Sequence, residues 1–282
     1  MFTIKTETSE LRLYVEGSEN NEVILLLSGG PGVPDYLQNV SATLNKTYKT
    51  VRFDQRGVGL SLAYNENYEI ENYLSDIDYI IKELDVDSIH IFGHSWGGLL
   101  AQMYTIKYPT KVKSLFLCSP SSGVGTIWKR MEKEVMNHNK NQATNLEWFS
   151  MGFYSLLGMM GVDFGYKKVF ANVWRYYFKN PKDAPPANKK WLAGINAASI
   201  NSTRKNIVKM SNDKLNEKMA NIRLPIILTY GKYDIYGESK RYSFERLVNA
   251  RVFEFENAGH LPWIQDKDAF IKVVNNFYKD KG

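Results

Sequence analysis

Short apolar runs alternate with amphipathic segments along the first 120 residues. Over residues 2–16 apolar and polar positions alternate, which predicts two antiparallel strands joined near Ser9-Glu10. Four apolar runs are typical of strands buried on both faces, namely residues 23–27, 50–53, 89–92 and 112–118. Helical periodicity lies between them, over residues 37–44, 70–84 and 99–108. This alternation predicts an α/β protein with a mostly parallel central sheet and helices on both of its faces.

The pattern changes between residues 121 and 219. Helix-like segments rich in aromatic residues and methionine follow one another there without an intervening strand. We interpret residues 121–219 as a helical cap, inserted into a core domain of residues 1–120 and 220–282. Most of the cap aromatics are expected to form its own core, while four are candidates for contact with substrate: Trp128, Trp148, Tyr176 and Trp191. Strands over 224–230 and 251–255 and helices over 238–247 and 269–278 complete the chain.

Ser95 lies at the junction between a predicted strand and a predicted helix, within the motif Gly93-His94-Ser95-Trp96-Gly97. A serine on such a sharp turn adopts a strained backbone conformation, so the positions two residues away must be nearly free of side chains. The turn exposes the hydroxyl and directs the first N–H groups of the helix toward the space beside it. The motif in this context predicts a nucleophile elbow.

A serine hydroxyl needs a base to take its proton, and the base needs an acid to hold its tautomer. Ser95, Asp234 and His260 each follow a predicted strand, and the carboxyl ends of parallel strands share one edge of a sheet. The order Ser, Asp, His is that of hydrolases built on this elbow. We therefore predict a catalytic triad of Ser95, Asp234 and His260. The other histidines are weaker candidates for the base, since His94 is expected to point away from the serine.

A glycine-rich loop, Ser28-Gly29-Gly30-Pro31-Gly32, follows the strand over 23–27. It lacks the Gly-Lys-Ser/Thr ending of a phosphate loop and is too short for a dinucleotide fingerprint. We expect its backbone to supply one oxyanion donor, Gly30, with the N–H of Trp96 as the other. The polar turn that begins at Asp54 is expected to be structural, with Asp54 capping backbone amides.

Composition excludes several other classes of protein. The net charge of +6 is mild and the lysines are dispersed, so no nucleic-acid partner is expected. The four histidines and the single Cys118 show no metal-ligand spacing, and neither a metal nor a cofactor is predicted. No signal peptide or membrane-spanning run is evident, and one cysteine suits a reducing compartment. We expect a cytoplasmic monomer that acts on a small molecule or short peptide, with no membrane partner.

These motifs together resemble the proline iminopeptidase family of α/β-hydrolases. The resemblance rests on residues 27–32, 54–61 and 93–98, and on the acid and base segments 231–234 and 258–260. It covers the core domain and implies an α/β-hydrolase fold with an inserted helical cap. Family members usually carry histidine at the first position of the glycine-rich loop, where this chain has Ser28.

The resemblance implies release of N-terminal proline or small residues from short peptides by a triad working through an acyl-enzyme. Such a peptidase needs carboxylates to pair with the substrate ammonium, and the family supplies them largely from the cap. Residues 150–212 contain only Asp163 and Asp183 as acids. Six further carboxylates remain as candidates: Glu132, Glu134, Glu147, Asp213, Glu217 and Glu238. The alternative is an esterase or lactonase for small apolar acyl substrates, and fold alone excludes neither a cofactor-free oxygenase nor a binding protein.

Overall fold

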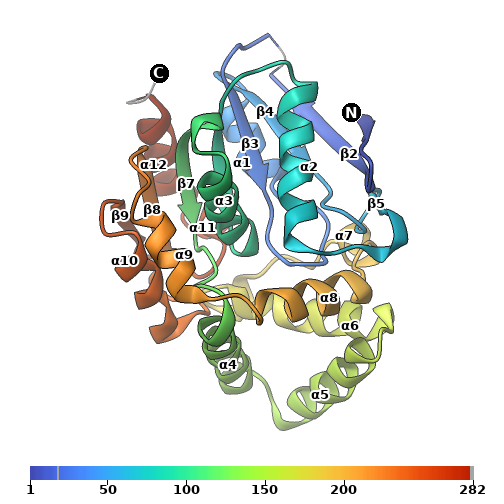
Figure 1. The fold of residues 1–282 in the computed structure, drawn as a ribbon. Helices are drawn as coiled ribbons and strands as arrows, with labels where there is room; N and C mark the ends of the chain where they lie inside the picture. Colours follow the sequence, from blue (N-terminus) through green and yellow to red (C-terminus); the bar gives the residue numbers. More distant parts are fainter. Residues whose placement is uncertain (18, 280–282) are drawn as a thin grey trace.

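The fold is known from a computed structural model, which describes residues 1–17 and 19–279. Figure 1 shows a twisted central sheet with helices on both sides and a group of helices beyond one edge. The strands pair in the order β1-β2-β4-β3-β6-β7-β8-β9, and β5 pairs with β2. Their bounds are Phe2–Lys5, Ser9–Glu16, Val23–Leu27, Lys49–Phe53, Leu62–Ala63, Ile89–His94, Val112–Cys118, Ile226–Gly231 and Arg251–Phe255 for β1 to β9.

The sheet is antiparallel only at its amino-terminal side. β1, β4 and β5 each run antiparallel to β2, while β4, β3, β6, β7, β8 and β9 form a continuous parallel series. The predicted α/β architecture is therefore confirmed. The strands predicted from continuous apolar runs match β3, β4, β6 and β7 closely, and the strand predicted over 251–255 matches β9. The two-residue strand β5 was not predicted.

Strand β3 shows why its sequence is apolar throughout. Leu25 and Leu27 belong to one core cluster, together with residues of α2 (Ile70–Glu83) and α3 (Trp96–Lys107). Ile24 and Leu26 belong to a second cluster, with residues of α1 (Gln38–Leu44) and α12 (Lys267–Lys279). Because helices cover both faces, successive residues of the strand are buried in opposite directions.

Six α-helices separate β7 from β8, and we call this segment the helical insertion. They are α4 (Gly125–Gln142), α5 (Asn145–Met159), α6 (Asp163–Val173), α7 (Lys189–Ala193), α8 (Ala197–Ile207) and α9 (Asn212–Met219). In Figure 1, α4, α5, α6 and α8 lie beyond the edge of the sheet toward which the parallel strands point. The division into core and cap at residues 121 and 219 stays a prediction. A short 3-10 helix, η3 (Trp174–Tyr177), follows α6 within the same segment.

The last part of the chain contributes two strands and three α-helices. Helix α10 (Arg241–Arg246) follows β8, and α11 (Pro262–Gln265), which was not predicted, precedes α12. Over the described residues, no helix is both long enough and apolar enough to cross a membrane. Cellular location and oligomeric state stay predictions.

Candidate active site

Ser95 is the single residue between β6 and α3. Its backbone angles are φ 55° and ψ −123°, a strained conformation for a residue with a side chain. The glycines around it allow this turn to approach its neighbours. A Cβ on Gly97 would lie 2.1 Å from the carbonyl oxygen of Leu27, and one on Gly93 would lie 2.7 Å from that of Gly97. The sequence motif therefore forms the strand–turn–helix geometry of a nucleophile elbow.

His260 and Asp234 meet at the same edge of the sheet. The Nδ1 atom of His260 lies 3.3 Å and 3.2 Å from the two carboxylate oxygens of Asp234. Asp234 also accepts a hydrogen bond from the N–H of Tyr236, at 3.1 Å. Burial alone would raise the pKa of Asp234, but His260 and these hydrogen bonds favour the ionised form and hold its pKa below the ordinary value.

The loop that carries His260 is fixed by backbone contacts. A Cβ on Gly231, at the end of β8, would lie 2.0 Å from the carbonyl oxygen of Gly259, so only glycine allows this close approach. The N–H of His260 donates to the carbonyl oxygen of Tyr177, at 2.8 Å. Since Tyr177 lies in η3, the helical insertion holds the backbone of the candidate base directly.

The Ser95 hydroxyl forms a hydrogen bond with a tyrosine, Tyr236, that was not predicted from the sequence. Ser95 Oγ lies 2.8 Å from the hydroxyl of Tyr236, which lies 3.0 Å from Ser121 Oγ. Among the described residues, no hydrogen bond joins the side chains of Ser95 and His260. The ring of Tyr236 packs edge-on against that of His260, with centroids 5.0 Å apart. The proximity of Tyr236 to Asp234 in the chain was the signal that could have found it.

The two candidate oxyanion donors lie on loops that a buried hydrogen-bond chain connects. Trp96 is the first residue of α3, so its backbone N–H has no acceptor within the helix. Its indole donates to Gln55 at 3.0 Å, and Gln55 donates to the carbonyl of Ser28 at 2.9 Å. Gly30, in the loop after Ser28, lines the cavity beside Ser95. The amide of the preceding glycine, Gly29, is engaged by the Tyr36 hydroxyl at 2.8 Å.

The other histidines are held by structural contacts. His94 bonds to Tyr36 through Nδ1 (2.6 Å) and to the carbonyl of His260 through Nε2 (2.9 Å). Burial, with the neighbouring His260, holds the pKa of His94 well below its ordinary value, so the ring stays neutral. His90 contacts Ser114 inside the sheet, and His138 contacts the backbone of the insertion. As expected, Asp54 accepts hydrogen bonds from backbone amides.

A cavity of about 1150 Å³ lies between Ser95 and the helical insertion. Ser95, Tyr236 and His260 line its floor, and α4, α5, α6 and η3 supply most of its walls. Most of the lining side chains are apolar, and they include three of the four predicted aromatics: Trp128, Trp148 and Trp191. The prediction for Tyr176 is wrong. That residue is buried with Met151 and Val173, while the adjacent Tyr177 lines the cavity.

One carboxylate, that of Glu132, is found among the described residues that line this cavity. Both of its oxygens accept hydrogen bonds from Arg204, at 2.5 Å and 2.7 Å. Of the other candidate acids, Glu147 is paired with Arg175 outside the lining. The cavity therefore offers an apolar surface whose single carboxylate already has a cationic partner. No group of acidic, histidine or cysteine residues able to hold a metal occurs in the described chain.

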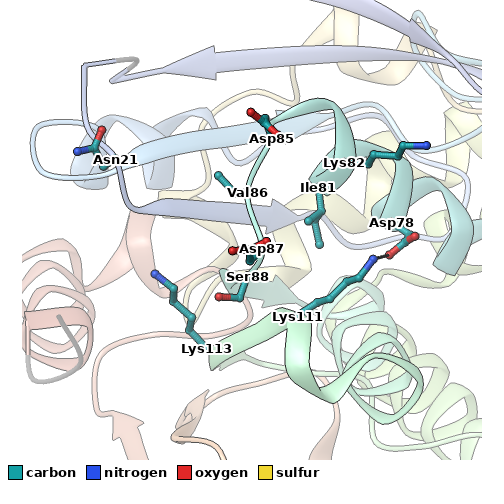
Figure 2. Close-up of a pocket in the computed structure, with 10 residues that line it drawn as sticks. All are labelled: Asn21, Asp78, Ile81, Lys82, Asp85, Val86, Asp87, Ser88, Lys111 and Lys113. Atoms are coloured by element: carbon teal, nitrogen blue, oxygen red, sulfur yellow. Dashed lines mark hydrogen bonds and ion pairs between the residues drawn. The ribbon is translucent and has the colours of Figure 1, made fainter.

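A second, open depression of about 740 Å³ lies at the opposite edge of the sheet, around the amino ends of β6 and β7 (Figure 2). Its charged side chains are partly paired, since Lys111 donates to Asp78 at 2.5 Å. None of Ser95, Asp234 and His260 lines it. The chemistry expected from the sequence lies at the other edge.

A strained serine at a strand-to-helix turn, beside a buried histidine–aspartate pair, is an arrangement typical of serine hydrolases of the α/β class. The family model for the alpha/beta hydrolase fold matches residues 22–267. The chain therefore belongs to the α/β-hydrolase family and is an enzyme of that family.

Comparison with individual proteins refines this placement. The chain is 23% identical over 279 residues to a proline iminopeptidase of Clostridioides difficile, covering 94% of this chain and 92% of that protein. A hydrolase from Pseudomonas aeruginosa superposes with a TM-score of 0.72 at 18% identity, over 98% of this chain and 97% of that one. An esterase from Exiguobacterium antarcticum gives 0.69 at 15% identity, over 96% of each chain. The predicted resemblance to the proline iminopeptidases is thus confirmed.

Proposed function

We propose that this protein is a serine hydrolase in which Ser95 is the nucleophile, His260 the general base and Asp234 the acid that orients it. The observation that supports this most directly is that Ser95 and His260 line the same end of one cavity, while His260 Nδ1 lies 3.2 Å from the carboxylate of Asp234. The strained turn at Ser95 and the low pKa of Asp234 are consistent with these roles.

In the proposed reaction, Ser95 Oγ attacks the substrate carbonyl as His260 Nε2 takes its proton. The backbone N–H groups of Trp96 and Gly30 stabilise the negative oxygen of the tetrahedral intermediate. His260 then donates the proton to the leaving group, which departs and leaves an ester on Ser95. Water, deprotonated by His260, attacks this ester, releases the acid and restores the serine.

We infer that the acyl group is apolar and that the scissile bond is an ester. A substrate ammonium would need an unpaired carboxylate in the cavity, because a buried cation without a partner is strongly unfavourable. Glu132 is already bound at both oxygens by Arg204. An apolar acyl group gains from burial against the tryptophans of the cavity wall and requires no such partner.

Release of N-terminal proline from peptides is the second candidate. It is favoured by the name that the relatives carry and by the position of Glu132 in the cavity wall. For this function, Glu132 would have to exchange its contact with Arg204 for the ammonium of the substrate. Both partners are partly exposed, so the cost of that exchange is about 1 kcal/mol or less.

The deciding experiment compares kcat/KM for proline 4-nitroanilide with that for the 4-nitroanilide and the 4-nitrophenyl ester of cyclopentanecarboxylic acid. These substrates share a ring size and separate the effect of the amine from that of the leaving group. Preference for the ester, with no gain from the amine, supports the esterase. Preference for the proline anilide over its carbocyclic analogue supports the peptidase.

Two variants make the outcome specific. Glu132→Gln should raise KM for the proline substrate alone if its carboxylate binds the amine. Glu147→Gln is the matched control, because Glu147 is also paired with an arginine but does not line the cavity. Turnover of any of these substrates that survives Ser95→Ala would refute the proposed mechanism.

A further inference from the structure

The outer face of α5 is apolar and exposed. Leu146 and Phe149 are each 80% exposed, Phe153 is 56% exposed and Leu156 is 53% exposed. No charged residue occurs from Trp148 to Val162. Most of the aromatic residues of the helical insertion were expected to form a local core, but Phe149 and Phe153 do not take part in one.

The exposed positions of α5 form one continuous stripe. With 3.6 residues per turn, positions 146, 149, 152, 153, 156 and 159 fall on one side of the helix. The opposite side is occupied, since Met151 is buried and Trp148 and Ser155 line the cavity. The stripe borders the cavity at Gly152 and Met159, which also line it. In Figure 1, α5 lies at the end of the helical insertion that is farthest from the sheet. We call the exposed residues of α5 and of the turn after it the α5 patch: Leu146, Phe149, Phe153, Leu156, Met159, Met160, Val162 and Phe164.

The α5 patch is larger than the apolar surface that a monomer usually exposes. Its eight side chains are between 44% and 80% exposed and together offer on the order of 1,000 Å². Monomeric proteins rarely expose a contiguous apolar patch of more than a few hundred Å². A stable protein–protein interface takes about 800 Å² from each partner, so the patch is large enough for one.

The stripe is also complementary to itself. In a pair of antiparallel α5 helices centred between residues 152 and 153, Leu146 lies opposite Met159 and Phe149 lies opposite Leu156. Gly152 then lies opposite Phe153. An added Cβ on Gly152 would meet no atom within 4 Å, so this side of the helix is open at its midpoint. Two antiparallel copies of α5 related by a two-fold axis would therefore place each phenylalanine ring over the glycine of the other copy.

We propose that the α5 patch binds a second copy of this chain, forming a two-fold symmetric dimer through antiparallel α5 helices. The patch carries no charge between residues 148 and 162, as the centre of a self-association surface requires. The two copies would repel each other through the rest of the helical insertion, which is positively charged. Residues 121–219 hold 16 Lys and Arg against 7 Asp and Glu. Added salt screens this repulsion, so the dimer should become more stable as ionic strength rises. The proposal does not depend on the proposed function.

The first test is sedimentation velocity of the full chain between about 0.5 and 100 μM protein, at 0.1 M and 0.5 M NaCl. We expect a monomer–dimer equilibrium that shifts toward the dimer at the higher salt concentration. Phe149→Glu should weaken it roughly 100-fold or more, because the charge enters the contact twice. Phe149 does not line the cavity, so hydrolytic activity should persist. Val248→Glu is the matched control, since Val248 is 74% exposed and lies outside the α5 patch.

The second test reports on geometry. Cys118 is buried and is the only cysteine, so an introduced cysteine reports on its own surroundings. Phe153→Cys lies beside the proposed axis and should form a disulfide-linked dimer on mild oxidation, whereas Val248→Cys should not. A chain that stays monomeric at 100 μM, or equal cross-linking of both variants, overturns the proposal. Salt-sensitive binding of a monomer to phosphatidylglycerol vesicles, abolished by Phe149→Glu, would also overturn it by assigning the patch to a lipid surface.

Discussion

The contact between Ser95 and Tyr236 leads to a prediction whose direction is not obvious. In the structure the hydroxyl of Ser95 is hydrogen-bonded to the hydroxyl of Tyr236, at 2.8 Å, and not to His260. Burial raises the pKa of Tyr236, so its hydroxyl stays protonated over the working range of pH. For the proposed attack, the Ser95 hydroxyl must give up this partner and turn toward His260. Tyr236 thus stabilises the resting state relative to the transition state.

A hydrogen bond between neutral groups contributes about 0.5–1.5 kcal/mol. Tyr236→Phe removes it without changing the ring that packs on His260, so kcat/KM for a small 4-nitrophenyl ester should rise about two- to twelve-fold. The rate of reaction with a fluorophosphonate, which modifies the serine directly, should rise in the same proportion. Ser121→Ala is the control, because it removes the other partner of Tyr236 but leaves the contact with Ser95. A tenfold or larger loss of kcat/KM in Tyr236→Phe would refute this reasoning and give the tyrosine hydroxyl a role in the transition state.

Three further predictions concern the site and the core. Asp234→Asn should lower kcat about 10⁴-fold, measured with the preferred ester, because His260 loses the acceptor that fixes its tautomer. Asp76→Asn should destabilise the protein by about 3–5 kcal/mol in urea unfolding, because Asp76 is the buried partner of the fully buried Arg56. The pKa of His94 is lower in the folded than in the unfolded chain, so only the unfolded chain binds a proton there just below pH 6.5. The free energy of unfolding should therefore lose nothing to His94 above pH 6.5 and fall by about 1.4 kcal/mol for each pH unit below it. Unfolding at pH 7.5 and 5.5 measures this slope, which His94→Gln should reduce; an unchanged slope would contradict the assignment.

The parallel strands could be predicted from the sequence because burial on both faces leaves a continuous apolar run. β3 and β7 begin and end where the apolar runs do, whereas four of the five residues of the edge strand β9 are exposed. The convergence of Ser95, Asp234 and His260 followed from topology alone, since each follows the carboxyl end of a parallel strand. These features depend on local composition and on one rule of connectivity, so they need no knowledge of packing between distant segments.

The walls of the cavity could not be predicted in the same way. Tyr176 and Tyr177 are adjacent aromatic residues in a 3-10 helix, and their packing partners decide which of them faces Ser95. Tyr177 lines the cavity, and its backbone carbonyl accepts the N–H of His260, a contact between segments far apart in the sequence. Hydrophobic periodicity shows that a segment has an apolar side but not what covers it, so the exposure of Phe149 could not be predicted either.

The separation between the two parts of the site has a consequence for specificity. Contacts within the core hold the candidate nucleophile. The backbone of Gly97 packs against the carbonyl of Leu27, and the Trp96 indole is linked through the Gln55 side chain to the glycine-rich loop. The helical insertion supplies both members of the Glu132–Arg204 pair, from α4 and α8. Substitutions there can therefore change which substrate binds without disturbing the elbow. Relatives of this chain are named as proline iminopeptidases and an esterase is among the proteins of similar fold, so the substrate class does not follow from the fold alone.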